Sequence, residues 1–159
     1  MSAPDVNDLA RLRRDSVEAA LSQVGDRWTF LILREAFFGV RRFVDLRRNL
    51  GVARNVLADR LKKLVDNGIL ERFEYSERPP RDEYRLTEKG RDLYGLTIAL
   101  MQWGDRWCLD EPPLRITHAA DDGLVEQVLR CTCCGEDVDV RDVRYESTDE
   151  SHRSSAYPS

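Results

Sequence analysis

Several features that mark common protein classes are missing or scarce in this 159-residue sequence. It has no run of 18 apolar residues, so no membrane-spanning helix is expected. Its N-terminal stretch, MSAPDVNDLARLRRDS, lacks the apolar core of a secretory signal peptide, and we therefore expect a cytoplasmic protein. Only two histidines occur, His118 and His152. Because neither lies in a nucleophile motif, the sequence does not indicate an enzyme.

Cysteine is also scarce, and its distribution is uneven. The chain has four cysteines, and three of them, Cys131, Cys133 and Cys134, lie within one tetrapeptide, whereas Cys108 stands alone. Clustering of this kind suits metal binding or thiol redox chemistry better than the disulfide framework of a secreted protein.

The sequence does contain a basic stretch between Arg41 and Arg72. This stretch holds nine arginines and lysines against four acidic residues, a net charge of +5, although the whole chain carries −4. A local basic cluster in an acidic chain is typical of a phosphate-binding face, and it indicates a nucleic-acid partner. A solvated helical hairpin is the alternative explanation of the same charges.

The same stretch has the apolar spacing of two short helices. Residues at i, i+3 and i+7 predict the first helix: Phe43, Leu46 and Leu50. Residues at i, i+4 and i+7 predict the second: Leu57, Leu61 and Leu64. Gly51 can end the first helix, and Asn67-Gly68 ends the second. Two helices joined by a short turn that contains glycine form the helix-turn-helix pattern.

Two further helices are expected before this motif and two strands after it. Residues 15–24 predict a helix that ends at Gly25, and Asp26 can cap the next helix, which ends at Gly39. Residues 69–75 and 83–87 predict strands, joined by a polar loop over 76–82. Two strands joined by a loop directly after a helix-turn-helix make a winged helix. The wing loop carries Arg78 and Arg81, which could reach phosphates or a minor groove. The alternative explanation of these two arginines is that they only keep the loop soluble.

A long helix is predicted after the wing, capped by Thr87. Its apolar residues follow a 3-4-3-4 spacing: Leu93, Leu96, Leu100, Trp103 and Trp107. This seam predicts a homodimer interface, and the alternative is that all five residues enter one core. The expected fold class is mainly α (α+β): a winged helix-turn-helix with a two-stranded wing and a long C-terminal dimerisation helix, followed by a short acidic tail with cysteines.

Four stretches in order carry a resemblance to a known family: GDRWTFLILREAFFGVRRFVDLRRNL, VLADRLKKLVDNGIL, EYRLTEKGRDL and MQWGDRW. Over residues 15–110 the chain resembles the HxlR family of winged-helix transcriptional regulators, which is related to the MarR regulators. The resemblance implies a homodimer that binds double-stranded DNA at an inverted-repeat operator and that responds to an effector the sequence does not identify. It also implies that the first and last helices of the domain form the dimer contact, which adds Leu21 to the seam.

The chain departs from the family pattern at two places. Ser16 stands where family members often carry a sensor cysteine, and a serine hydroxyl is not a thiolate nucleophile at neutral pH. Ala53-Arg54 stands where the recognition helix often begins with Ser-Pro. Alanine cannot cap a helix, and the missing cap lowers the stability of the helix by about 1 kcal/mol. Arg54 instead places a positive charge where a phosphate could accept hydrogen bonds from the first amides.

The leucine face of the second helix determines which residues point outward. The opposite side carries Asn55, Asp59, Lys62 and Asp66, flanked by Val56 and Lys63. Asn55 could read adenine, Lys62 guanine, Asp59 a cytosine amino group and Val56 a thymine methyl. Candidates for phosphate or minor-groove contacts are Arg42, Arg54, Lys63, Arg78 and Arg81. Arg60 lies off this face and is expected to be structural.

The composition changes near Pro112-Pro113, and we expect three segments: a flexible N-terminus (1–14), the DNA-binding and dimerisation domain (15–110) and an acidic, partly disordered tail (111–159). In the tail, Cys131 and Cys134 form a CxxC followed by glycine, which is half of a zinc knuckle, and His118 is a candidate third ligand. No complete tetrahedral set is present, so zinc, a thiol switch and a remnant of a site all stay open. No other cofactor is expected. The competing function is a thiol- or zinc-dependent redox or protein-interaction module without DNA specificity.

Overall fold

The structure is a computed structural model, and it describes residues 16–77 and 80–144. Its contacts divide the chain into two units. The first unit spans Ser16–Gln127, and residues 128–144 are the described part of the second unit. The expected N-terminal segment 1–14 and the end of the tail lie outside the described residues.

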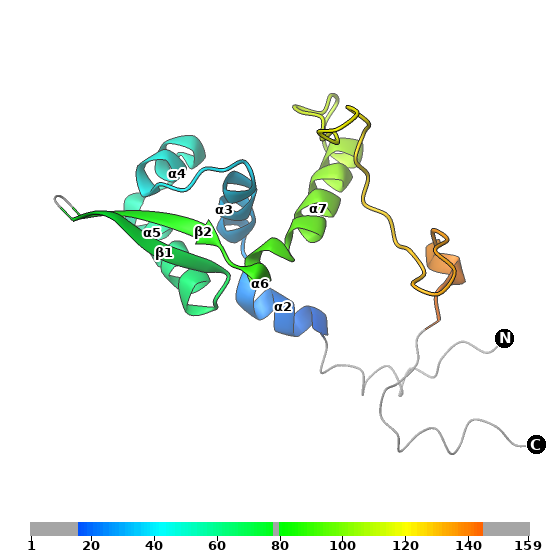
Figure 1. The fold of residues 1–159 in the computed structure, drawn as a ribbon, viewed down its shortest axis with the longest axis horizontal. Coiled ribbons are helices and arrows are strands. Elements are labelled where there is room, and N and C mark those ends of the chain that lie inside the picture. Colours follow the sequence, from blue (N-terminus) through cyan, green and yellow to red (C-terminus); the bar gives the residue numbers. More distant parts are fainter. Residues whose placement is uncertain (1–15, 78–79, 145–159) are drawn as a thin grey trace, which may run out of the picture. The chain divides into compact units, whose positions relative to one another are not determined.

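The first unit has the predicted fold class (Figure 1). Its elements in chain order are α2 (Ser16–Val24), α3 (Arg27–Phe37), α4 (Phe43–Leu50), α5 (Arg54–Asp66), β1 (Leu70–Glu77), β2 (Pro80–Leu86), α6 (Glu88–Arg91) and α7 (Tyr94–Trp107). The described part of the second unit holds one short 3-10 helix, η1 (Val140–Asp142). The helix-turn-helix is α4 and α5, and the antiparallel pair β1–β2 is the wing.

The ends of the helices follow the predicted signals. The Asp26 carboxylate accepts hydrogen bonds from the amides of Trp28 (3.0 Å) and Thr29 (3.1 Å), and it therefore caps α3. Gly51 has a φ of 60° and ends α4 in the left-handed conformation. Ala53 precedes α5 and provides no side-chain cap, because its methyl group cannot accept a hydrogen bond.

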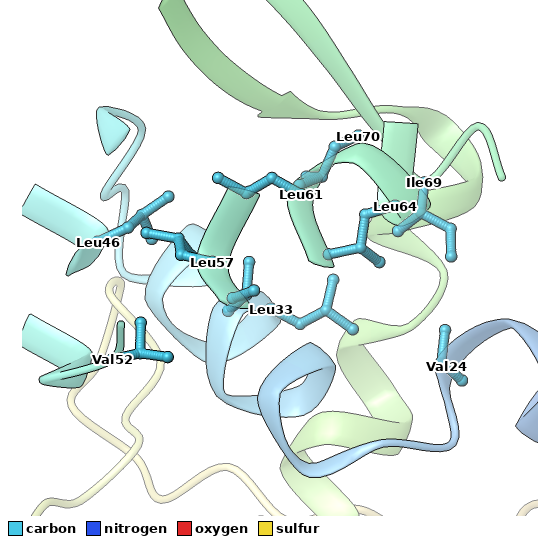
Figure 2. Close-up of a cluster of buried hydrophobic side chains, with 10 residues drawn as sticks. Val24, Leu33, Leu46, Val52, Leu57, Leu61, Leu64, Ile69 and Leu70 are labelled. Atoms are coloured by element: carbon cyan, nitrogen blue, oxygen red, sulfur yellow. The ribbon is translucent and has the colours of Figure 1, made fainter. Parts of the chain in front are cut away.

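Leucine, isoleucine and valine side chains form the core, most of them from α3, α4 and α5 (Figure 2). The predicted inner face of α5 is buried, since Leu57, Leu61 and Leu64 are each at most 1% exposed. Leu33 of α3 and Leu46 of α4 pack in the same cluster and are equally buried. Full burial of one such side chain stabilises the fold by about 1.5–3 kcal/mol. The core therefore fixes α5 with one face inward and the opposite face outward.

The wing is longer than the sequence indicated. The predicted loop over residues 76–82 is wrong at both ends, because β1 continues to Glu77 and β2 begins at Pro80, which pairs with Glu77. Proline is tolerated there because the first residue of an edge strand need not donate a hydrogen bond. A register shift between Glu74 and Ser76 accommodates the extension. An ion pair of 2.7 Å between Arg72 and Asp82 links the two strands.

The single long helix predicted after Thr87 is also wrong, because the structure has two helices there. Thr87 caps only α6, through a hydrogen bond from the Gly90 amide to its hydroxyl (3.1 Å). Gly90 is buried, and a Cβ built on it would lie 2.2 Å from the carbonyl oxygen of Ile69. This close approach of two backbones holds α6 on the hairpin, and the chain turns at Asp92-Leu93 before α7 begins.

Polar contacts also join the ends of α2 and α5. The side-chain amide of Asn67, which follows α5, donates to the Gln23 carbonyl of α2 (3.4 Å). Lys89 of α6 donates to both the Gln23 side chain (2.7 Å) and the Asn67 carbonyl (2.8 Å). One lysine therefore ties two helix ends that are far apart in the sequence.

The first unit continues past the expected boundary at residue 110. The Gln102 side chain of α7 donates to the Val125 carbonyl (2.7 Å) and accepts from the Gln127 amide (2.9 Å). These two bonds fasten the segment after α7 to that helix. Across residues 16–77 and 80–144, no helix has the length and apolar character that a membrane crossing requires.

Candidate nucleic-acid interface

Contacts behind α5 hold the recognition helix in place. The Arg60 guanidinium lies 3.3 Å from the Asp26 carboxylate, which caps α3, so this arginine has the structural contact expected for it. Partial burial by itself would raise the pKa of Asp26. Hydrogen bonds from the hydroxyl and amide of Thr29, together with the charge of Arg60, outweigh burial and lower that pKa below its ordinary value. The ionised cap therefore joins α3 to α5.

The outer face of α5 carries the residues that the leucine pattern places there. Asn55, Asp59, Lys62 and Asp66 are exposed, whereas Val56 and Lys63 beside them are partly buried. Their exposure leaves the polar atoms of Asn55 and Asp59 accessible to base edges. Contact of any of these side chains with a base stays a prediction.

Lys62 and Asp66 form an ion pair one helical turn apart on this face. The hydrogen bond from Lys62 to the Asp66 carboxylate is the main cause that raises the pKa of Lys62, and the nearby charge of Asp66 adds to it. The lysine is therefore cationic at neutral pH but already has an acidic partner. A base or phosphate that binds Lys62 must compete with Asp66.

A hollow of about 570 Å³ lies where α4 meets the start of α5, and three arginines line it: Arg47, Arg48 and Arg54. Arg48 is paired with Asp45 at 2.8 Å. Within the described part of the chain, Arg47 and Arg54 have no ion pair. Helix α5 begins at Arg54, which belongs to this lining, and its first amides have no side-chain cap because Ala53 precedes the helix. This combination suits an anionic oxygen.

Arg47 and Arg48 were not among the residues proposed for DNA contact. They belong to the basic stretch but lie on the outer face of α4, whereas most of the predicted contacts belong to the second helix and the wing. The signal was their position: with Leu46 directed into the core, the two residues that follow it turn outward.

Arg42 lies between the helix-turn-helix and the wing. Its guanidinium is 3.5 Å from the Glu83 carboxylate of β2, and the neighbouring Arg41 carbonyl accepts a hydrogen bond from the Tyr84 amide (2.8 Å). The segment before α4 therefore extends the edge of the wing by an isolated bridge. Arg42 stays a predicted phosphate contact that is already oriented by Glu83.

The wing tip is described only in part. Arg78 lies outside the described residues, and for Arg81 the structure gives the backbone pairing with Ser76 alone. Further down the hairpin, Arg85 stacks 4.5 Å from the centre of the Phe73 ring and pairs with Glu83 at 3.3 Å. The predicted wing contacts of Arg78 and Arg81 therefore remain predictions.

Comparison with known proteins identifies the family. The model of the HxlR-like helix-turn-helix family matches residues 23–112, more than half of the chain. The chain belongs to the HxlR family. Rv3095 of Mycobacterium tuberculosis (strain ATCC 25618 / H37Rv), described as an uncharacterised HTH-type transcriptional regulator, is 50% identical over 141 residues, covering 87% of this chain and 89% of the relative.

Two solved structures extend the comparison. PA1607, described as a candidate transcription factor, is 35% identical with a TM-score of 0.75, and the match covers 83% of this chain and 94% of that one. The reduced form of the redox regulator HypR is 31% identical with a TM-score of 0.55, covering 58% of this chain and 92% of that one. This HxlR chain is therefore a transcriptional regulator with a winged helix-turn-helix. Its likeness to PA1607 spans more of the chain than its likeness to HypR.

Helix α7 of this HxlR chain buries one face and exposes the other. Ile98 is 4% exposed, and the ring of Tyr94 lies 4.8 Å from that of Phe37 in α3. The predicted seam lies on the exposed side, with exposed fractions of 49% to 66%: Leu96, Leu100, Trp103 and Trp107. Leu21 of α2 is 55% exposed. Leu93 differs, because it is partly buried and packs against the core.

The exposed seam excludes the alternative that all of these residues enter one core of the single chain. Four large apolar side chains at coiled-coil spacing form a patch that a folded chain rarely leaves in water without a partner. Tryptophan side chains such as these are enriched at contacts between proteins.

The predicted metal ligands are divided between the two units of the chain. Cys131 and Cys134 lie in one turn of the second unit, whereas His118 belongs to the first unit. Among residues 16–77 and 80–144, no group of three or more His, Cys, Asp or Glu side chains is arranged to hold a metal ion. Hydrogen bonds from the Cys134 amide first, then from the Cys133 amide and the Cys134 side chain, lower the pKa of the Cys131 thiol. Ser16 is exposed at the first residue of α2.

Proposed function

We propose that this regulator acts as a homodimer that binds an inverted-repeat operator in duplex DNA. The observation that carries the proposal is the presence, on one unit, of an exposed recognition face on α5 and an exposed apolar seam on α7. The first face suits a major groove and the second suits another protein chain. A dimer would present two α5 helices to two half-sites about 10–10.5 bp apart, or a multiple of that spacing.

Base reading would come from the outer face of α5. The Asn55 side chain is exposed in the first turn, and an amide can donate to and accept from adenine together. Asp59 lies one turn further on and could accept from a cytosine amino group. Lys62 would read guanine only after leaving Asp66, so its contribution should be smaller than that of an unpaired lysine.

Backbone binding would come from the arginines around the start of α5. Arg47 and Arg54 line the same hollow as the uncapped amides, and a DNA phosphate there would accept from both groups. Arg42, which Glu83 holds at the edge of the wing, would add a further phosphate contact. Such contacts fix the position of α5 on the duplex without choosing a sequence.

Two matched variants test the assignment of roles. Asn55→Ala should lose discrimination at one base position, worth about 1–3 kcal/mol. Arg54→Ala should weaken binding to all sequences by similar factors, and it should make the salt slope shallower by about one unit. Both are measured by fluorescence anisotropy on the operator and on its single-base variants, across several salt concentrations. Arg81→Ala belongs in the same series as a probe of the wing.

The result for wild-type protein decides between the two functions raised by the sequence. Affinity for duplex DNA that falls steeply with salt agrees with the proposal, because phosphate contacts release counterions. An affinity that stays flat from low to physiological salt contradicts it and favours a protein-interaction module. If Asn55→Ala weakens every operator variant equally, the assigned role of the α5 face is wrong.

The dimer is tested on α7. Trp103→Glu should convert the dimer to a monomer, because a charge buried at an apolar contact is strongly disfavoured. Leu124→Glu is the matched control, since Leu124 is 68% exposed in the same unit but lies outside the seam. Sedimentation velocity reports the mass of each variant, and circular dichroism checks that both fold. A Trp103→Glu protein that remains a stable dimer removes α7 from the interface.

A further inference from the structure

Two short turns in the chain have the same backbone hydrogen bonds. In the turn over residues 116–125, the His118 amide donates to the Gly123 carbonyl (2.8 Å), and the Asp122 amide donates to the His118 carbonyl (2.9 Å). In the turn over residues 129–138, the Cys131 amide donates to the Glu136 carbonyl (2.9 Å), and the Gly135 amide to the Cys131 carbonyl (3.0 Å). The bonds connect the same relative positions in both turns.

The match extends to the flanks and to the backbone angles. Isolated bridges close the two turns, Thr117 with Leu124 and Arg130 with Asp137. The fifth position is left-handed in each, with a φ of 59° at Asp122 and 76° at Gly135. We therefore regard the two segments as copies of one turn type, although their sequences differ.

This turn type brings the side chains of its first and fourth positions together. In the first copy, Nδ1 of His118 lies 3.1 Å from a carboxylate oxygen of Asp121. In the second copy, the equivalent positions are occupied by Cys131 and Cys134. Two cysteines separated by two residues and followed by a glycine form the turn with which many proteins hold zinc.

Burial in the second unit points in the same direction. None of the residues 128–144 is buried, and large apolar side chains such as Leu129 (63%) and Val140 (73%) are exposed. A hydrophobic core therefore does not hold this segment, yet its turn and η1 are ordered by hydrogen bonds. Small units without a core are usually stabilised by disulfides or by a metal, and Cys131 and Cys134 are both free thiols.

We propose that Cys131 and Cys134 form a metal-binding knuckle that takes a thiophilic divalent cation of the zinc class. On binding, two S–H bonds are replaced by two sulfur–metal bonds, and both protons pass to the buffer. No oxidant or reductant is needed. The remaining positions of a tetrahedral ion are available to water or to further ligands.

The test uses the full-length, reduced protein without a bound metal, titrated with Co²⁺ as a spectroscopic probe and then with Zn²⁺ in competition. Thiolate–cobalt charge-transfer absorption in the near ultraviolet should appear on titration and vanish as Zn²⁺ displaces the cobalt. Cys131→Ser and Cys134→Ser should each lower the affinity by at least about tenfold. Cys108→Ser is the control, because Cys108 is an exposed thiol outside the turn. His118→Ala tests the third ligand that the sequence predicts.

The outcomes separate this proposal from DNA binding and from a thiol switch. Absorption that is lost in both knuckle variants and kept in Cys108→Ser supports the metal site, whatever the DNA affinity of these variants. Absence of thiolate absorption in the wild type overturns the proposal, as does absorption that persists in the Cys131→Ser/Cys134→Ser double variant. Thiol counting that finds Cys131 and Cys134 joined as a disulfide after aerobic purification, with no metal taken up after reduction, also overturns it.

Discussion

The two units of this chain reach an ordered structure by different means. In Ser16–Gln127, leucines at helical spacing are removed from water, and the helices follow from that burial. In residues 128–144, no side chain is buried, and the order rests on hydrogen bonds within a turn and a capped 3-10 helix. A hydrophobic core confers stability that tolerates many surface changes. A segment without a core depends on a few polar or metal contacts, so it is the part whose order a ligand could control.

The largest expected difference between the units is the effect of a leucine truncation. Leu61→Ala in α5 should lower the free energy of unfolding by about 2–5 kcal/mol, because it leaves a cavity in the core. Leu129→Ala in the second unit should change it by less than about 0.5 kcal/mol, because that side chain is 63% exposed. Urea titrations followed by tryptophan fluorescence measure both. Equal losses would mean that Leu129 packs against something in solution.

The next comparison concerns the two left-handed glycines. Gly51→Ala should destabilise the first unit by about 1–2 kcal/mol, because its φ of 60° is unfavourable for a side chain although space is available. Gly135→Ala has a similar strain at a φ of 76°. It should leave the unfolding of the first unit unchanged and should weaken only cobalt binding. A fall in the main unfolding transition for Gly135→Ala would contradict the separation of the units.

A smaller, pH-dependent effect distinguishes two aspartates that cap helices. Asp26→Ala should destabilise the first unit by about 1 kcal/mol at neutral pH, through loss of the α3 cap. Because the pKa of Asp26 is lowered below 3.8 in the folded chain, its contribution is complete well above pH 3.8 and is lost as the pH falls through that lower pKa. The difference between wild type and variant should therefore shrink toward pH 3.

Asp139→Ala is the matched control for this prediction. Asp139 caps η1, and its hydrogen bond from the Arg141 side chain, with that from the Arg141 amide, lowers its pKa as well. Since η1 contains no buried side chain, the main unfolding transition should be the same in Asp139→Ala and wild type from pH 3 to pH 7. Thermal scans at several pH values measure both variants, and a gap for Asp26→Ala that does not narrow in acid would refute the assigned role of the ionised cap.

The smallest expected effect is on the outer face of α5. Asp66→Asn removes the partner of Lys62 and should leave the unfolding transition almost unchanged, because the pair is exposed. It should raise affinity for duplex DNA several-fold and steepen the salt slope by up to about one unit, because Lys62 becomes available to a phosphate or base. Anisotropy titrations at three salt concentrations measure it. An unchanged slope would place Lys62 away from the DNA.

Much of the first unit was predictable from the sequence because its signals are local. The α5 helix follows from the spacing of Leu57, Leu61 and Leu64, and the start of α3 follows from Asp26. The exposure of Asn55 then results from the helical period alone. These patterns do not identify which of the exposed residues contact DNA.

Other features depend on contacts that are distant in the sequence or on backbone bonds. The place of α6 on the hairpin depends on Gly90, which lies close to the carbonyl of Ile69, some twenty residues earlier. The shared turn type of residues 116–125 and 129–138 rests on backbone hydrogen bonds, so His118 and Cys131 occupy equivalent positions without any sequence repeat. Arg47 and Arg48 were not predicted, because the hollow that they share with Arg54 is formed by two helices.

The contacts among Gln23, Asn67 and Lys89 have a consequence for the length of DNA that separates two half-sites. They join the end of α2 to the end of the recognition helix through bonds of 2.7 to 3.4 Å. In the proposed dimer, α2 would lie near the contact between chains. These hydrogen bonds would then help to fix the distance between the two α5 helices. One inserted base pair moves a half-site by about 3.4 Å and also rotates it around the duplex. Such a dimer would discriminate between operators that differ in half-site spacing as well as between operators that differ in sequence.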